Sequence, residues 1–351
     1  MEVGVNYPWF DYGWDFGVAP PKWRRDDDVP NWVRRVRAQL HHFAGIGITV
    51  IRWFVLGDGL TYGMGADAPK LDKGARQGDV WRFAPPILSD EVQEHFDALL
   101  QQFDQVNKQV PRPIRLLPVL IDFKFCDPGI YIVGEDPNRQ QSVPDEDWVK
   151  QGRADAIIRS PSQFIIRVLQ PLLQLSRAHA DTIYAWDLIN EPEWITNNWH
   201  LDRHTQGRLP VDESSMRDFL EDGKSAIRQA GFKCTIGFRS IETIRRTRIF
   251  ADINQFHHYR DFDPALQQNP FVDRRYPGII GEFATSANQD TWQELRQRGL
   301  SQRVLERLKF AQRQRYELAI AWSFTNPDSR SSWNVQVEND IECFTQGRNC
   351  R

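Results

Sequence analysis

The stretch 183–191, IYAWDLINE, decides which fold we expect for this chain. It is a run of branched and aromatic residues that ends in the polar pair Asn190 and Glu191, directly before Pro192. Short apolar runs of this kind are typical of buried strands in a parallel sheet. We therefore predict a strand that ends at Asn190-Glu191-Pro192 and presents a carboxylate at the rim of the sheet.

Similar runs recur along the chain and are separated mostly by amphipathic stretches. This alternation predicts βαβ units with a parallel sheet. An open, doubly wound sheet would also explain it, but no glycine-rich phosphate loop follows the first run. We therefore predict an α/β fold with a single (β/α)8 TIM barrel, forming one catalytic domain over residues 1–351. The other seven runs begin at Val3, Thr49, Ile114, Cys234, Ile253, Gly278 and Leu318, and helical patterns cover 31–44, 90–108, 162–178, 214–230 and 300–316.

The connections after the second, third and fourth strands are unusually long, over residues 56–88, 123–159 and 193–211. They are rich in aromatic residues, and long loops in compact domains are usually functional or disordered. In a barrel these loops emerge on the face where active sites are built. We expect these three loops to form the walls of an active site.

Composition excludes several classes of partner. The net charge of -3 gives no basic field for nucleic acid, and no stretch approaches the roughly 20 apolar residues of a membrane helix. We expect no nucleic acid and no membrane as partners. Residues 1–9 lack the features of a signal peptide. The localisation stays open: cytoplasmic if Met1 is the native start, secreted if a leader was removed.

The four cysteines are too few for a disulfide-built scaffold and match no zinc spacing. Cys343 and Cys350 could close a small loop near the C-terminus. We predict no metal and no cofactor.

A second glutamate stands at the end of another strand. Glu282 follows Gly278-Ile279-Ile280-Gly281 in the seventh run. Either glutamate alone could cap a helix or pair with an arginine. Two glutamates on separate strands, with aromatic residues around them and Asn190 directly before the first, form a more specific combination.

With these residues in place, the chain resembles the clan A glycoside hydrolases, particularly the cellulase and mannanase family numbered five. The resemblance departs at the end of the third strand, where these enzymes often have a histidine and this chain has Asp122-Phe123. The matching residues are Arg52, Asn190-Glu191-Pro192, His257, Tyr259, Glu282 and Trp322.

The resemblance implies a retaining mechanism with two carboxyl groups about 5 to 5.5 Å apart. Glu191 would be the acid/base, with a pKa raised by burial or a nearby negative charge, and Glu282 the nucleophile. Arg52 and Tyr259 would hydrogen-bond Glu282, and Asn190 would hold the sugar 2-hydroxyl. Strict alternation turns neighbouring strand residues to opposite faces, so the backbone must bulge or leave strand geometry at residues 190–191.

The remaining candidates are assigned by the same alternation. His257 and Tyr259 share a face, whereas His258 should point toward the helix layer. Trp322 is a candidate for stacking on a sugar ring. Trp194, Trp199 and Trp333 are weaker candidates for the same role, and loop packing would explain about half of them.

The leading hypothesis is an O-glycoside hydrolase that cleaves a β-linked glucan, mannan or related oligo- or polysaccharide by double displacement. Two alternatives stay open: a non-catalytic carbohydrate-binding barrel, and a metal-dependent barrel enzyme with His257, His258 and Glu282 as ligands. The sequence leaves open the sugar, the linkage, internal or terminal cleavage, and the oligomeric state.

Overall fold

The structure is a computed structural model, and the description below covers only part of the chain. The side chains of residues 29–34, 130–132 and 140–142 are not part of it. The described residues are 1–8, 15–16, 29–57, 88–126, 130–132, 140–142, 154–199, 209–259, 271, 277–286, 304–325 and 331–348.

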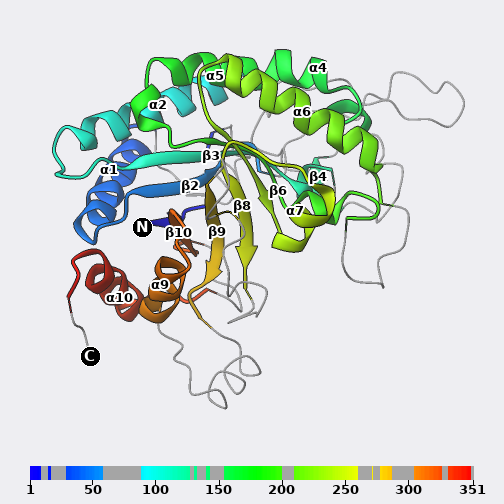
Figure 1. The fold of residues 1–351 in the computed structure, drawn as a ribbon. Coiled ribbons are helices and arrows are strands. Elements are labelled where there is room, and N and C mark those ends of the chain that lie inside the picture. Colours follow the sequence, from blue (N-terminus) through cyan, green and yellow to red (C-terminus); the bar gives the residue numbers. More distant parts are fainter. Residues whose placement is uncertain are drawn as a thin grey trace, which may run out of the picture.

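Eight parallel strands form a closed barrel in the order β1-β10-β9-β8-β7-β6-β3-β2 (Figure 1). Each coincides with one of the eight runs in the sequence, so the predicted barrel is confirmed and the open sheet is excluded. The strands are β1 (Glu2–Asn6), β2 (Val50–Phe54), β3 (Arg115–Asp122), β6 (Trp186–Asn190), β7 (Cys234–Phe238), β8 (Asn254–His258), β9 (Gly278–Ala284) and β10 (Leu318–Trp322).

Helices lie outside the strands, and all five predicted helical segments are present. One of them is interrupted, because a π-helical turn separates α4 from α5 within the predicted segment 162–178. The sequence analysis did not predict the helices α7 and α10. The helices are α1 (Val29–Gly45), α2 (Asp90–Asn107), α4 (Pro161–Phe164), η2 (Ile165–Leu169), α5 (Gln170–Arg177), α6 (Glu213–Gln229), α7 (Ile241–Thr247), α9 (Val304–Arg313) and α10 (Val335–Thr345).

Short polar side chains fix where the helices begin. The Asp212 carboxylate accepts from the Ser215 amide at the start of α6, and the Ser89 hydroxyl accepts from the Val92 amide at the start of α2. Farther along α6, a Cβ at Gly223 would lie 2.5 Å from a Leu188 methyl carbon. Glycine at this position therefore lets α6 approach β6 closely.

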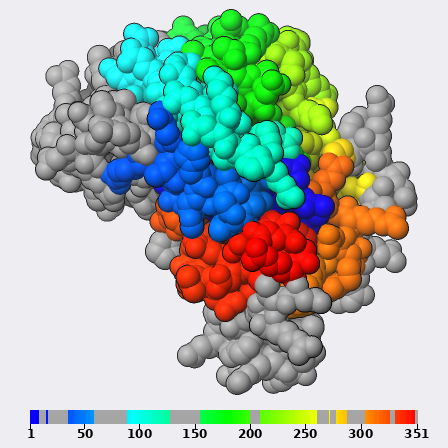
Figure 2. Space-filling model, turned by 90° about the vertical axis from the view of Figure 1, so that its left-hand side faces the viewer, coloured from blue at the N-terminus to red at the C-terminus, as the bar shows by residue number. Residues whose placement is uncertain are grey.

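The last helix completes the helical layer beside the first one. Figure 2 shows α10, in red, against α1, in blue. Thr345 donates to the Ile46 carbonyl at 3.0 Å, and His42 lies 2.9 Å from a Glu338 carboxylate oxygen. The helix that follows the first strand and the helix that follows the last strand are therefore in contact.

The three cysteines that the structure describes are of two kinds. Cys343 is disulfide-bonded, whereas Cys126 and Cys234 are buried free thiols. The predicted partner, Cys350, lies outside the described residues. Among the helices that the structure describes, none has the length and apolar character needed to cross a membrane.

The barrel interior is layered, with apolar side chains below and polar ones above. The lowest layer is a cluster of buried aliphatic residues from alternate strand positions: Val50, Leu117, Ala185, Ile253, Ile279, Leu318 and Ile320. Side chains alternate along a strand, so Arg52, two residues after Val50, and Asp187, two residues after Ala185, also point into the interior. Both side chains are fully buried. The next inward position of β2 is Phe54, which packs with Val119 and Trp322 near the mouth.

The long connections are described only in part. In the connection after β3, β4 (Ile130–Ile132) pairs antiparallel with β5 (Gln140–Ser142). Short 3-10 turns, η1 (Phe123–Phe125) and η4 (Pro192–Trp194), directly follow β3 and β6. Most of the connections at 56–88 and 123–159, and residues 200–208 of the connection at 193–211, lie outside the described residues, so it stays a prediction that these loops wall a site.

Candidate active site

The backbone leaves strand geometry where the first glutamate follows β6. Glu191 has φ 46° and ψ 54°, a left-handed conformation, and the pairing of β6 with β7 shifts register between Asp187 and Asn190. This confirms that the backbone changes conformation at Asn190 and Glu191, so that both side chains reach the site. Such a conformation is rare for a residue other than glycine and is often found at functional sites.

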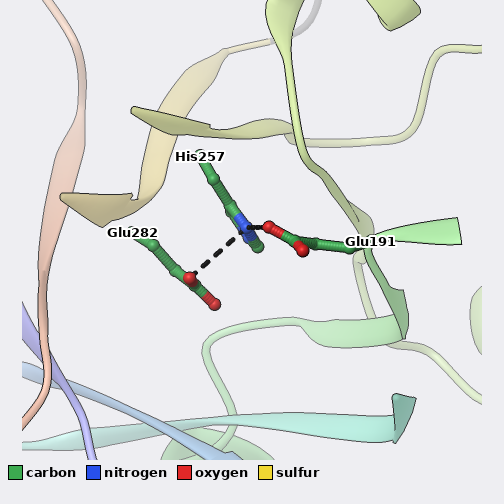
Figure 3. A group of neighbouring side chains, drawn as sticks. All are labelled: Glu191, His257 and Glu282. Carbon is green, nitrogen blue, oxygen red and sulfur yellow. Dashed lines mark hydrogen bonds and ion pairs between the residues drawn. The ribbon is translucent and has the colours of Figure 1, made fainter. Parts of the chain in front are cut away.

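Glu191 and Glu282 approach each other around His257 at the mouth of the barrel (Figure 3). The His257 Nδ1 atom lies 2.7 Å from Glu191 Oε1 and 3.4 Å from Glu282 Oε2. One carboxylate oxygen of each glutamate and this nitrogen all lie within 4.8 Å of one another. The Glu191 side chain is 14% exposed and the Glu282 side chain 4%. Glu191 is therefore the more accessible carboxylate from the barrel mouth.

Arg52 binds Glu282 from inside the barrel, as predicted. Its Nη1 donates to Glu282 Oε1 at 2.7 Å and to Asn6 Oδ1 at 3.0 Å. Its Nε and Nη2 donate to Asp187 Oδ2 at 3.0 and 2.9 Å. Nη2 also donates to Asn190 Oδ1 at 2.7 Å. One buried cation thus compensates two carboxylates and orients two amides.

The Tyr259 hydroxyl donates to Glu282 Oε2, which confirms the predicted contact. Trp322 lies at the end of β10, 9% exposed, and packs with Phe54 and Tyr259. Its place at the mouth agrees with the sequence analysis, and its stacking on a sugar stays a prediction.

Trp194 contacts the first glutamate directly, and its stacking on a sugar stays a prediction. Its indole Nε1 donates to Glu191 Oε2 at 2.6 Å, and the Arg239 guanidinium lies over its ring, 4.3 Å from the centroid. It lies in η4, which directly follows Glu191, so the ring folds back onto that carboxylate. The indole therefore orients Glu191, and Arg239 covers one of its faces.

Two other tryptophan candidates, Trp199 and Trp333, pack within the protein. Trp199 is 1% exposed and packs near Phe238, so it offers no surface to a sugar. The Trp333 indole packs against Phe43 and donates to Glu338 in α10. Both belong to loop and helix packing.

The pKa values of the two glutamates correct one expectation of the sequence analysis. Burial raises the pKa of Glu191, but hydrogen bonds from His257 and Trp194 outweigh it, so the pKa lies below its ordinary value. Burial raises the pKa of Glu282 above its ordinary value, although His257 and Arg52 act in the opposite direction. The prediction of a raised Glu191 pKa is therefore wrong for the ligand-free protein, because His257 favours the carboxylate form.

The position of His257 between two carboxylates favours its protonated form. Burial lowers the pKa of His257, but the charge of Glu282 and the hydrogen bond with Glu191 outweigh it, so the pKa is raised. A protonated imidazole between two carboxylates titrates together with them. The three side chains form one coupled acid-base unit.

His258 points away from the site, as alternation predicts. It lines a cavity on the outer side of the barrel with Phe283 and with Arg307 and Phe310 of α9. The metal-ligand set His257, His258 and Glu282 therefore does not converge. The set that converges is Glu191, His257 and Glu282.

The sequence analysis missed the residues that surround Arg52 inside the barrel. Gln255 Nε2 donates to Asp187 Oδ2 at 2.7 Å, and Asn6 Nδ2 donates to the Gly281 carbonyl at 3.0 Å. A charged residue inside an apolar strand was the available signal, since a buried carboxylate needs a partner. That rule shows that Asp187 needs a partner, but it does not identify Arg52 as the partner.

A glycine makes room for this network. A Cβ at Gly237 would lie 2.9 Å from Arg52 Nη2 and 3.1 Å from Asp187 Oδ2. Any side chain at this position of β7 would displace the guanidinium. Gly237 is thus part of the site's architecture, although it carries no chemistry.

Comparison with known proteins yields structural likeness only. No family model matches the sequence. No curated protein matches it either. Many solved structures match this chain, and three β-mannanases among them match nearly its whole length. They are the β-1,4-mannanase of the sea hare Aplysia kurodai (TM-score 0.59, 18% identity, 99% of this chain and 92% of that one), the endo-1,4-β-mannanase of Eisenia fetida (0.60, 17%, 100% and 92%) and the β-mannanase of the blue mussel Mytilus edulis (0.61, 16%, 98% and 92%). At these identities, the likeness shows that the chain shares the (β/α)8 barrel fold of these β-mannanases.

Proposed function

We propose that the protein is a retaining glycoside hydrolase in which Glu191 is the acid/base and Glu282 the nucleophile. The observation that carries the proposal is the approach of one oxygen of each carboxylate to within 4.8 Å at the barrel mouth. Retaining enzymes place the two groups about 5 to 5.5 Å apart, whereas inverting enzymes leave about 6.5 to 9.5 Å for a water molecule.

The roles follow from what contacts each carboxylate. Glu282 receives hydrogen bonds from Arg52 and Tyr259, which orient it and favour its ionised form. Glu191 is the more exposed of the two and hydrogen-bonds His257. A proton moving from His257 Nδ1 to Glu191 across 2.7 Å produces the neutral acid.

The first step breaks the glycosidic bond. Glu191 gives its proton to the leaving oxygen while Glu282 attacks the anomeric carbon and forms a covalent glycosyl ester. As positive charge develops on the sugar ring, the negative charge of Glu282 is stabilised. This offsets the burial that raises the pKa of Glu282 in the ligand-free protein.

The second step releases the sugar. Glu191, now ionised, takes a proton from water, and the water oxygen attacks the anomeric carbon from the face that the leaving group occupied. The ester bond breaks, and Glu282 recovers its carboxylate. Two inversions give net retention, with both carboxyl groups restored to their starting charge.

The proposed substrate is a β-linked oligo- or polysaccharide of the mannan or glucan type. The names of the three structural neighbours favour a β-1,4-linked mannan. A panel of β-1,4-mannan, β-1,4-glucan and aryl β-glycosides, with analysis of the products, identifies the sugar and the position of cleavage.

Azide rescue separates the two roles. We expect Glu282→Ala to abolish turnover and, with azide and an activated aryl glycoside, to give a glycosyl azide of inverted configuration. Glu191→Ala should still release an activated phenol and, with azide, give a product of retained configuration. Normal activity of Glu282→Ala would refute the proposal.

Glu193 provides a matched control. It is a buried glutamate two residues after Glu191, with a pKa raised to about 7 by burial, and its Oε1 accepts from the Ser240 amide at 3.4 Å. It therefore supports the start of α7 through the Ser240 amide. Glu193→Gln should keep the wild-type reaction and its stereochemistry.

Two further assays address the alternatives. The convergence of Glu191, His257 and Glu282 would also suit a cation, so a metal-dependent reaction predicts loss of activity with a chelator. The proposed mechanism predicts full activity in its presence. A non-catalytic binding barrel predicts saccharide binding by calorimetry without release of product.

A further inference from the structure

Asp122 lies beside the site at the position where the sequence departs from the resembled family. It is the last residue of β3, 8% exposed, and is the register partner of Asn190 in β6. Asn190 Nδ2 donates to Asp122 Oδ2 at 2.7 Å. Asp122 thus contacts a predicted sugar-binding residue and neither catalytic glutamate.

The orientation of the Asn190 amide follows from the chemistry of its two partners. Arg52 can only donate hydrogen bonds, so the atom 2.7 Å from its Nη2 must be the amide oxygen. An ionised Asp122 can only accept, so the amide nitrogen must face it. If the amide were flipped, its nitrogen would face the Arg52 donor and its oxygen would face the Asp122 carboxylate. One N–H of Asn190 Nδ2 then remains for a ligand.

The backbone in turn holds Asp122. Its Oδ1 accepts from the Lys124 amide at 2.9 Å, and the carboxylate caps the 3-10 turn η1. Each carboxylate oxygen is therefore engaged by a different donor. This fixes the side chain on both sides and leaves Asn190 little freedom to rotate.

We propose that Asp122 is a positioning residue that aims the free N–H of Asn190 at the 2-hydroxyl of the sugar. The inference rests on the proposed glycosidase function and adds a residue to it. Hydrogen bonds to the 2-hydroxyl strengthen in the transition state, so a fixed amide accelerates the reaction more than it tightens binding. Asp122 acts only through Asn190.

The charge of Asp122 makes this contact sensitive to pH. Burial raises the pKa of Asp122 to about 7, and the negative charge of Glu191 acts in the same direction. The hydrogen bond from the Lys124 amide, the charge of Lys124 and the hydrogen bond from Asn190 lower the pKa but do not outweigh burial. A neutral carboxyl is a weaker acceptor than a carboxylate. The contribution of Asp122 is therefore present above its pKa and is lost as the pH falls through about 7.

The experiment compares two substrates that differ only at the 2-position. An amide at residue 122 has one oxygen and one nitrogen, so Asp122→Asn can accept from Asn190 or from Lys124 but cannot accept from both. We expect it to lower kcat/KM roughly 10- to 100-fold on an aryl β-glycoside with a 2-hydroxyl, mainly through kcat. On the matching 2-deoxy glycoside it should have little effect. Turnover of the 2-deoxy substrate also shows that the variant is folded.

Two further variants sharpen the test. In the Asn190→Ala background, Asp122→Asn should cost nothing more, because the residue through which it acts is gone. Asp104→Asn serves as the control. This aspartate of α2 binds Thr182 and His179 on the outside of the barrel, and its removal should leave the ratio between the two substrates unchanged.

The outcomes separate the inference from the function on which it rests. Equal loss on both substrates, or no loss on either, would overturn the role of Asp122 while the glycosidase assignment stands. Failure of the unmodified protein to hydrolyse any β-glycoside or β-linked polysaccharide would instead overturn the proposed function itself.

Discussion

Arg52→Lys tests whether the geometry of the guanidinium, and not its charge alone, holds the site together. Arg52 makes five hydrogen bonds to four acceptor atoms on β1, β6 and β9, and its side chain is fully buried. A lysine ammonium has the same charge but three donors on one nitrogen. At least two of the five contacts must therefore be lost.

The size of the effect follows from these contacts. A hydrogen bond to a charged group contributes about 1.5 to 3 kcal/mol. Losing two should lower the free energy of unfolding by about 3 to 6 kcal/mol, a large part of the roughly 5 to 15 kcal/mol that a domain has. Poor orientation of Glu282 should reduce kcat/KM as well.

Urea denaturation followed by circular dichroism measures the change, because the midpoint and slope give the free energy of unfolding. Arg217→Lys is the matched control. Arg217 forms a half-exposed ion pair with Glu213 within α6, 2.7 Å long, and such pairs contribute little. A loss of less than about 1 kcal/mol for Arg52→Lys, close to the control, would refute the reasoning.

Two further substitutions and one thiol titration have defined outcomes. Gly237→Ala places a methyl group 2.9 Å from Arg52 Nη2 and should cost about 1 to 3 kcal/mol in thermal or urea unfolding; an unchanged midpoint would contradict the steric argument. Trp194→Phe removes a donor that lowers the pKa of Glu191, so the pKa should rise and the alkaline limb of the kcat/KM profile should move to higher pH. A downward shift would exclude Glu191 as the acid. Because Cys343 is disulfide-bonded, thiol titration in urea should count two thiols without reductant and four with it; four in both would exclude the bond.

The sequence determined the barrel, because burial on both faces makes each parallel strand a short apolar run. All eight strands fall on such runs, and the five amphipathic stretches between them contain the helices α1, α2, α4, α5, α6 and α9. Helix α7 has only seven residues, too few to show a clear periodicity. The interruption between α4 and α5 leaves the amphipathic pattern almost unchanged.

The sequence also placed Glu191 and Glu282 at strand ends and required the backbone to depart from strand geometry at Glu191. Those predictions depend only on chain order and on the alternation of side chains along a strand. Alternation likewise separated His257 from His258. Local rules were sufficient for each of these assignments.

The tertiary structure decided what contacts these residues. Trp194 folds back onto Glu191, a contact that depends on the turn directly after the strand. His257 lies between the two carboxylates because β8 is the neighbour of β9, and its proton reverses the expected pKa shift of Glu191.

Asp187 and Asp122 have partners that also depend on the tertiary structure. Both are acidic residues of predicted strands, and their partners Arg52 and Asn190 lie 135 and 68 residues away along the chain. Strand order and register bring them together, and a sequence pattern contains neither. The sequence therefore specified which groups stand at the barrel mouth, whereas closure of the barrel determined the hydrogen bonds and charges that fix their orientation and protonation.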